Sequence, residues 1–426
     1  MFLSSFRPRC AHTWVLFGLS LCAAGAAPGQ TTPTPAPIAS PSSPTSLRQA
    51  LDAAWALGLA SRTTPARLAE LQTRAQATQS LTAGSASVTL AHRTDQFTAN
   101  GGLREYEAEL AWPLWNPSVR ASTQRQIAAE QTALERQTAL ARLKLAGELR
   151  ELAAGLMLAQ LEREIATRKH AETTLLVQDV QRRVKAGDLA RVDGLLAQAS
   201  MQQTEMALAQ ADGGLLKLRS QWHLLTGLAS MPVVVEIAEA ALPVANRTPD
   251  GDHPAVQAAE ALLATAQAKL VLAQTDQRDP MELGLGITQE RSAFGAGADT
   301  TLRFALRIPL GGEHRNAPRV AAARADLDIA QAEADAATRQ VQADTAIASL
   351  ALTTARRNEA LAVVRSRLSS EVHALITRSY QLGEGDLPTR LRAENDKFDA
   401  DLSVARARID VQRAASQLNQ ALGLLP

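Results

Sequence analysis

The side chains that most often carry catalysis or bind metals are widely separated in this sequence. Beyond the amino-terminal segment the histidines are His92, His170, His223, His253, His314 and His373, and none belongs to an H-x₃-H or Cys/His motif. Metal sites usually need such ligands at short spacing. The sequence also lacks a P-loop, a nucleophile elbow and a paired-histidine helix. It therefore predicts no catalytic residue, no metal site and no cofactor, and we expect that the protein is not an enzyme.

The composition favours long helices. The chain has 426 residues, of which 3% are aromatic, and Ala, Leu, Gln, Arg and Glu dominate. This is typical of coiled coils rather than of a mixed α/β enzyme. The formal charge is only +1, and acidic and basic residues are interleaved as on solvated helix faces. We therefore expect no nucleic-acid partner.

The first residues have the pattern of a targeting segment. Arg7 and Arg9 precede an apolar run from Trp14 to about Ala27. Small residues at 24–26 offer an A-x-A cleavage site, which predicts a signal peptide at 1–26 and export of the protein. A membrane anchor is the alternative, but a run of about 14 residues is short for a span.

Both cysteines, Cys10 and Cys22, lie in this segment, so cleavage near Ala26 would leave a mature chain without thiols. Lipidation at Cys22 is a second alternative, although Leu21 before it is larger than a lipobox prefers. Residues 27–45 are rich in Pro, Ser and Thr and indicate an extended tether. No later stretch of about 20 apolar residues predicts a membrane-spanning helix.

The rest of the chain is a duplication with a separation of 196 residues. The matching positions are Pro113-Leu114 with Pro309-Leu310, Gly187 with Gly383, Leu195 with Leu391, Ala197 with Ala393, and Gly227 with Gly423. We therefore divide the mature chain into a first repeat at 46–230, a linker at 231–253 and a second repeat at 254–426.

Each repeat has the same predicted order of elements. A helix comes first, at 46–82 with a break near Thr63-Thr64-Pro65, and at 254–277. Two strands follow, then a very long helix, a glycine turn and a returning helix. From Pro117 to about Lys185 no proline interrupts the first long helix, which is on the order of 100 Å of helix. So long a helix must pack against partner helices. We expect Pro117 and Pro318 in the first turn of the two long helices, where a missing N–H is harmless.

The predicted strands have two different faces. Apolar and polar residues alternate in four runs, at 87–93, 105–112, 281–288 and 301–308. Each run has about the length that crosses a bilayer at a tilt, and Trp112 and Trp115 stand where an interfacial aromatic girdle would lie. A half-buried hairpin on a soluble domain is the alternative. In lipid, however, unpaired strand edges are not tolerated, and four strands cannot close a barrel. Three copies with twelve strands are the simplest closed barrel.

This layout resembles the TolC-type outer membrane efflux proteins over about residues 46–426. The local matches are Ser46-Leu47-Arg48-Gln49-Ala50-Leu51, Asp252-His253-Pro254-Ala255, and the segments Val184-Lys185-Ala186-Gly187 and Tyr380-Gln381-Leu382-Gly383 with the leucines that follow. The second turn segment departs from the family pattern at Pro388 and Arg392, which leaves its docking geometry open.

The resemblance implies a mainly α fold with a small transmembrane β part. It implies a homotrimer with a twelve-stranded β-barrel in the outer membrane, continuous with a periplasmic barrel of twelve helices. Such a channel is the passive exit duct of a tripartite efflux or secretion pump, with a periplasmic adaptor and an inner-membrane transporter as partners. A soluble periplasmic coiled-coil adaptor or scaffold is the alternative function, but an adaptor should have one helical hairpin rather than two. The exported substrate cannot be read from the sequence.

Two sets of residues follow from this architecture. The periplasmic turns and the adaptor-docking surface are assigned to Gly187, Leu189, Leu195, Gly383, Leu387 and Leu391. The charges expected to ring the pore or gate are Asp188, Asp193, Glu384 and Asp386. Rings of carboxylates attract cations, although solvated charge at helix ends is the simpler explanation.

Overall fold

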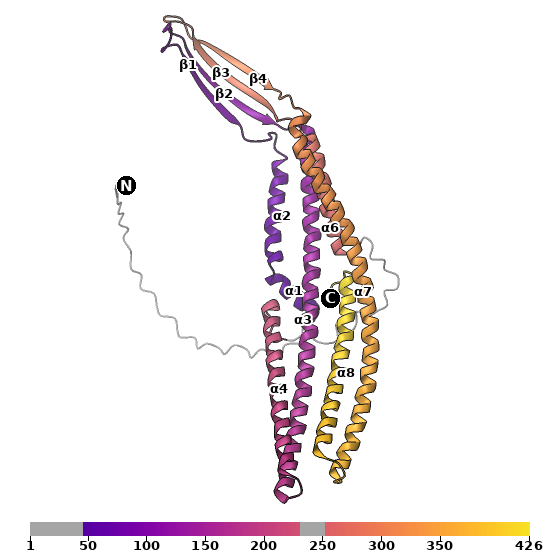
Figure 1. Cartoon of the computed structure of the whole chain (residues 1–426). Helices are drawn as coiled ribbons and strands as arrows, with labels where there is room; N and C mark the ends of the chain where they lie inside the picture. Colours follow the sequence, from indigo (N-terminus) through magenta and orange to yellow (C-terminus); the bar gives the residue numbers. More distant parts are fainter. Residues whose placement is uncertain (1–45, 231–251) are drawn as a thin grey trace, which may run out of the picture. The chain divides into compact units, whose positions relative to one another are not determined.

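The computed structural model describes residues 46–230 and 252–426 of the chain. The predicted signal peptide at 1–26, the tether at 27–45 and nearly all of the linker at 231–253 lie outside these residues. The described part is mainly helical, with one small sheet (Figure 1). No described helix has a stretch that is both long and apolar enough to cross a membrane.

The two repeats fold alike. The first comprises α1 (Leu47–Leu57), α2 (Leu59–Ala77), β1 (Ser87–Thr94), β2 (Arg104–Leu114), α3 (Pro117–Ala186) and α4 (Arg191–Thr226). The second comprises α6 (Pro254–Thr275), β3 (Met281–Arg291), β4 (Asp299–Arg307), α7 (Glu313–Gln381) and α8 (Leu387–Ala421). The starts of α3 and α7, and of α4 and α8, differ by the same 196 positions as the sequence repeat.

Two predicted helix features are wrong. The first helix breaks at Gly58 and not near Thr63-Thr64-Pro65, because Gly58 has an extended backbone that ends α1, while Pro65 is accommodated inside α2. Pro318 is not in the first turn of α7, which begins at Glu313. The missing N–H of Pro318 therefore leaves one carbonyl of the preceding turn without a helical partner. Pro117, by contrast, is the first residue of α3 as expected.

The long helices pack in pairs. α3 packs against α4, and α7 against α8, while α3 also contacts α6 and α8 and so joins the two repeats (Figure 1). The main core lies where α1, α3, α4 and α8 meet, around Leu51, Leu149, Leu156 and Trp222. Many buried positions of α3 are alanines, which allow the helices to approach closely.

The four strands form one antiparallel sheet in the order β1-β2-β3-β4. Its central pair, β2 with β3, brings one strand from each repeat together. The sheet therefore depends on both repeats, since neither supplies more than two of its strands.

Candidate functional site

The register of the sheet sorts its side chains into one apolar and one polar face. Residues directly opposite each other share a face, so the pairs Leu90 with Ala108, Ala108 with Ile287, and Ile287 with Leu302 define one row. The apolar face carries Val88, Leu90, Tyr106, Leu110, Trp112, Leu283, Leu285, Ile287, Leu302, Phe304 and Leu306. The predicted alternation of the strands is confirmed across all four.

In the central strand β3 the apolar face is more exposed than the polar face. Ile287 is 47% exposed and Phe304 76%, whereas Thr288 on the polar face is 7% exposed. This is the reverse of a soluble sheet, which turns its apolar side chains away from water.

The polar face carries an excess of carboxylates. It bears Glu105, Glu107, Glu109, Glu282, Glu290 and Asp299 against Arg93, Arg303 and Arg307. Arg303 crosses β3 to pair with Glu107 at 2.9 Å, and Arg307 pairs with Glu282 at 3.4 Å. Arg303 can reach across β3 because Gly284 and Gly286 leave the middle of that face without side chains.

The two helical turns at Gly187 and Gly383 have the same geometry. Both glycines are left-handed, with φ of 89° and 79°. After α3, the N–H of Asp188 bonds to the carbonyl of Arg183, and after α7 the N–H of Glu384 bonds to that of Ser379. This is the Schellman motif, in which a glycine lets the chain turn sharply out of a helix.

Next to these turns, the ends of α3, α4, α7 and α8 share a small core. It includes Leu176, Val177, Val180, Ala197, Tyr380 and Leu387, with Leu189 and Leu391 packed against it. Three of the four predicted leucines thus pack here. Leu195 is not part of this core and is 57% exposed.

The predicted acidic residues differ in what they contact. Asp386 caps α8 by accepting from the N–H of Thr389 at 3.2 Å, and hydrogen bonds from the side chain and the backbone of Thr389 lower the pKa of Asp386. Asp193 lies in the first turn of α4, where a carboxylate favours the helix dipole. Asp188 and Glu384 are exposed in the two turns. Asp386 and Asp193 therefore have structural roles whether or not they also face a pore.

Sequence reasoning missed the buried polar groups of this core. Tyr380 is 2% exposed, and the guanidinium groups of Arg183 and Arg390 lie over its ring at 5.3 and 4.8 Å from the ring centre. Burial raises the pKa of Tyr380, although both arginines oppose the shift. Glu394, 5% exposed, accepts a hydrogen bond of 3.0 Å from Thr173, and burial raises the pKa of that carboxyl.

A row of contacts joins α3 of the first repeat to α8 of the second. Carboxylates on α3 face bases on α8 in the pairs Glu151–Arg413, Glu162–Arg406 and Glu172–Lys397. At the far end of α8, the buried Arg150 donates to Gln420 Oε1 at 2.6 Å and to the Leu424 carbonyl at 2.8 Å. Burial lowers the pKa of Arg150 to about 10, so it stays charged at neutral pH.

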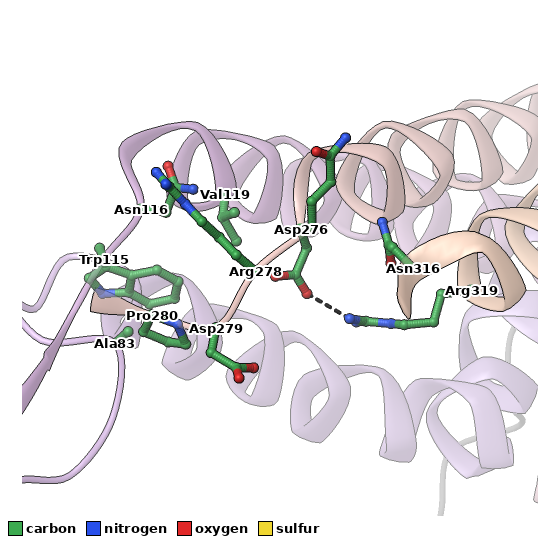
Figure 2. Close-up of a pocket in the computed structure, with 11 residues that line it drawn as sticks. Ala83, Trp115, Asn116, Val119, Asp276, Arg278, Asp279, Pro280, Asn316 and Arg319 are labelled. Atoms are coloured by element: carbon green, nitrogen blue, oxygen red, sulfur yellow. Dashed lines mark hydrogen bonds and ion pairs between the residues drawn. The ribbon is translucent and has the colours of Figure 1, made fainter. Parts of the chain in front are cut away.

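A cavity of about 440 Å³ lies where the strands meet the helices (Figure 2). Its lining includes Trp115 and Val119 at the start of α3, Asp276 and Arg278 after α6, and Asn316 and Arg319 of α7. Asp276 and Arg319 form an ion pair of 2.8 Å. Within the described ranges no group of three or more His, Cys, Asp or Glu residues is placed to hold a metal ion.

Comparisons with known proteins agree with this architecture. CusC, a protein whose structures describe transmembrane channel formation, has a TM-score of 0.73 at 15% identity over 89% of this chain and 92% of its own. The outer membrane protein VceC of Vibrio cholerae gives 0.69 at 16% identity, over 88% and 96%. The CmeC outer membrane channel of Campylobacter jejuni gives 0.68 at 14% identity, over 88% and 85%.

Similarity in sequence is more limited. Protein CyaE of Bordetella pertussis is 30% identical over 166 residues, which cover 34% of this chain and 34% of that protein. The match therefore spans about a third of the length of this relative. No protein-family model matches the chain. The structural matches establish the fold, and the TolC-type channel fold that the sequence predicted is confirmed.

Proposed function

We propose that this chain, which has the fold of TolC-type outer membrane channels, is itself a channel subunit of an outer membrane. One observation carries the proposal: the sheet leaves a continuous apolar face exposed and gathers its charged side chains on the other face. A sheet with large aliphatic and aromatic side chains outward is stable when that surface meets lipid.

We propose further that three copies form one channel. Within the described residues, β1 and β4 each pair on one side only, so the sheet has two open edges. Unpaired backbone groups are not tolerated in lipid, and pairing β4 of one copy with β1 of the next would satisfy them. Three copies would supply twelve strands, and their polar faces would line a wet pore.

The helices would extend this channel into the periplasm. Because α3 and α7 run from the strands to the turns at Gly187 and Gly383, these turns would lie at the end remote from the membrane. We assign to them, and to Leu189, Leu195, Leu387 and Leu391, the docking of a periplasmic adaptor that connects to an inner-membrane transporter. The exposed Leu195 is the leucine best placed to contact such a partner. The chain would act as a passive duct and catalyse no reaction.

The proposal is tested by expressing the full chain and following the mature protein. We expect it in the outer-membrane fraction, extractable only with detergent, running as a trimer on mild-detergent gels and conducting ions in planar bilayers. A soluble periplasmic monomer would overturn the proposal and would favour the adaptor or scaffold function instead.

A further inference from the structure

The cavity at the foot of the sheet contains polar groups that the chain itself does not satisfy. Asn316 is 4% exposed and lines the cavity, and its Oδ1 has no hydrogen-bond partner within the described residues. The indole N–H of Trp115, in the same lining, is enclosed and also has no partner. Enclosed donors and acceptors without partners cost free energy, which a polar ligand that reaches both would recover.

The charges around the cavity indicate what kind of ligand would fit. Arg278 makes no ion pair with any described residue, and Figure 2 shows its side chain extended toward Asn116 and Val119 at the start of α3. The first turn of α3 carries the partial positive charge of a helix start, although Pro117 has no N–H and the N–H of Ser118 bonds to Asn116 Oδ1. A guanidinium beside such a terminus leaves two positive centres together, and an anion between them would stabilise both.

The opposite side of the cavity offers Asn316 Oδ1 as an acceptor for a hydrogen-bond donor. Figure 2 shows Asn316 beside the Asp276–Arg319 ion pair, with the Asp279 carboxylate also in the lining. The charged lining residues are thus two arginines and two aspartates, which balance. A ligand with an anionic and a cationic end fits this arrangement better than a simple anion.

The position of the cavity connects it to the membrane. It lies where β2 ends and α3 begins, next to the last residues of the apolar face, Trp112 and Leu114. If the sheet crosses the outer membrane as proposed above, this level is the periplasmic interface, where phospholipid headgroups lie.

We propose that this cavity binds the headgroup of a zwitterionic phospholipid, phosphoethanolamine. The phosphate would lie between Arg278, the Trp115 N–H and the first turn of α3, and the ammonium group would donate to Asn316 Oδ1. The inference rests on the proposed membrane function, because it needs the lipid interface at this level.

Native mass spectrometry of the purified full-length mature protein tests the inference, with phosphatidylethanolamine, phosphatidylcholine and phosphatidylglycerol added in turn. We expect preferential retention of phosphatidylethanolamine, since the trimethylated ammonium of phosphatidylcholine cannot donate hydrogen bonds. Arg278→Gln and Trp115→Phe should each weaken its retention roughly tenfold, the scale of one lost hydrogen bond involving a charged group.

Two matched variants serve as controls. Arg324→Gln removes an arginine of α7 that does not line this cavity, and Trp55→Phe makes the same aromatic exchange within α1, away from the cavity and the sheet. Both should retain the lipid as the unchanged protein does.

Equal retention of the three lipids, or no effect of Arg278→Gln, would overturn the inference. Displacement of the lipid by inorganic phosphate would also overturn it, because the site would then take free phosphate. A chain that forms a conducting trimer but shows no lipid preference would contradict only this inference, and not the proposed function.

Discussion

At the scale of single residues, Glu394 is an ionisable group at a core position. Burial raises its pKa, Glu172 adds to the rise, and Thr173, Arg390 and Lys169 oppose it. The pKa of Glu394 is higher in the folded than in the unfolded protein. Glu394 therefore contributes most to the stability of the folded protein when the pH is below the ordinary glutamate pKa. This stability is lost as the pH rises through the raised folded pKa.

We therefore predict that Glu394→Gln stabilises the protein at neutral pH by roughly 1 kcal/mol and flattens its pH dependence between acidic and neutral pH. Thermal unfolding in detergent over that pH range measures both effects. Thr173→Val should act in the opposite direction, costing about 1–3 kcal/mol, because it leaves the carboxylate without its donor. A Glu394→Gln protein with the original pH dependence would show that another group titrates.

The turn glycines give a second prediction at this scale. At Gly187 a built Cβ meets nothing within 4 Å, so only the left-handed backbone opposes a side chain. Gly187→Ala should cost about 1–2 kcal/mol. Gly213, inside α4, also has open space but an ordinary helical backbone, so Gly213→Ala should stabilise by roughly 0.5–1 kcal/mol. The free energy of unfolding of the two variants is measured in urea. Effects of the same sign would contradict the explanation that the left-handed backbone at Gly187 requires glycine.

At the scale of elements, the contact of α3 with α8 between the two repeats includes exposed or half-exposed ion pairs. Such pairs contribute little individually and are screened by salt. We predict that Glu162→Arg and Arg406→Glu each destabilise the protein by roughly 0.2–1 kcal/mol, and that the double exchange restores most of the loss. Thermal unfolding at low and high salt measures the coupling, which should shrink at high salt. Additive losses would mean that the pair is not formed.

The strands allow a direct comparison of the two faces of the sheet. Leu302 and Thr301 are neighbours on β4 and point to opposite faces. If the apolar face meets lipid, Leu302→Lys should cost about 2–4 kcal/mol near the middle of the membrane and reduce the amount of assembled trimer. Thr301→Lys should be tolerated. The measurement is the amount of trimer in membrane extracts, seen on gels as a band that disappears on heating. Equal amounts for the two variants would argue against lipid contact of the apolar face.

These elements were predictable because they have strong periodic signals. The alternation of residues 281–288 and 301–308 fixed both the strands and their faces, and the repeat of Gly187 at Gly383 located the turns. Glu394 was missed because charge on a helix usually indicates a solvated face. Its spacing after Leu387 and Leu391 and before Phe398 nevertheless marks a core position. Which polar groups find partners across α3 and α8 depends on tertiary packing, which sequence spacing does not encode.

At the scale of the whole molecule, assembly would multiply the charge of the polar face. Each copy contributes six carboxylates and three arginines. In one row Glu290 stands between Glu105 and Asp299, and only Glu105 has a basic partner, Arg93 at 3.7 Å. Like charges opposite each other destabilise a sheet by a few tenths of a kcal/mol or more, so this row works against stability. A charged ring of this kind in a pore would instead favour the passage of cations.

We therefore predict that the trimer conducts K⁺ in preference to Cl⁻ and that Glu290→Gln with Asp299→Asn reduces this preference while making the sheet more stable. The reversal potential of single channels in a KCl gradient measures the selectivity. Glu205→Gln, which removes an exposed carboxylate of α4 outside the sheet, is the matched control and should leave both properties unchanged. An unchanged reversal potential in the double variant would mean that the polar face does not line the conducting path. The proposed arrangement of the three sheets would then be wrong, even though the fold of each copy would stand.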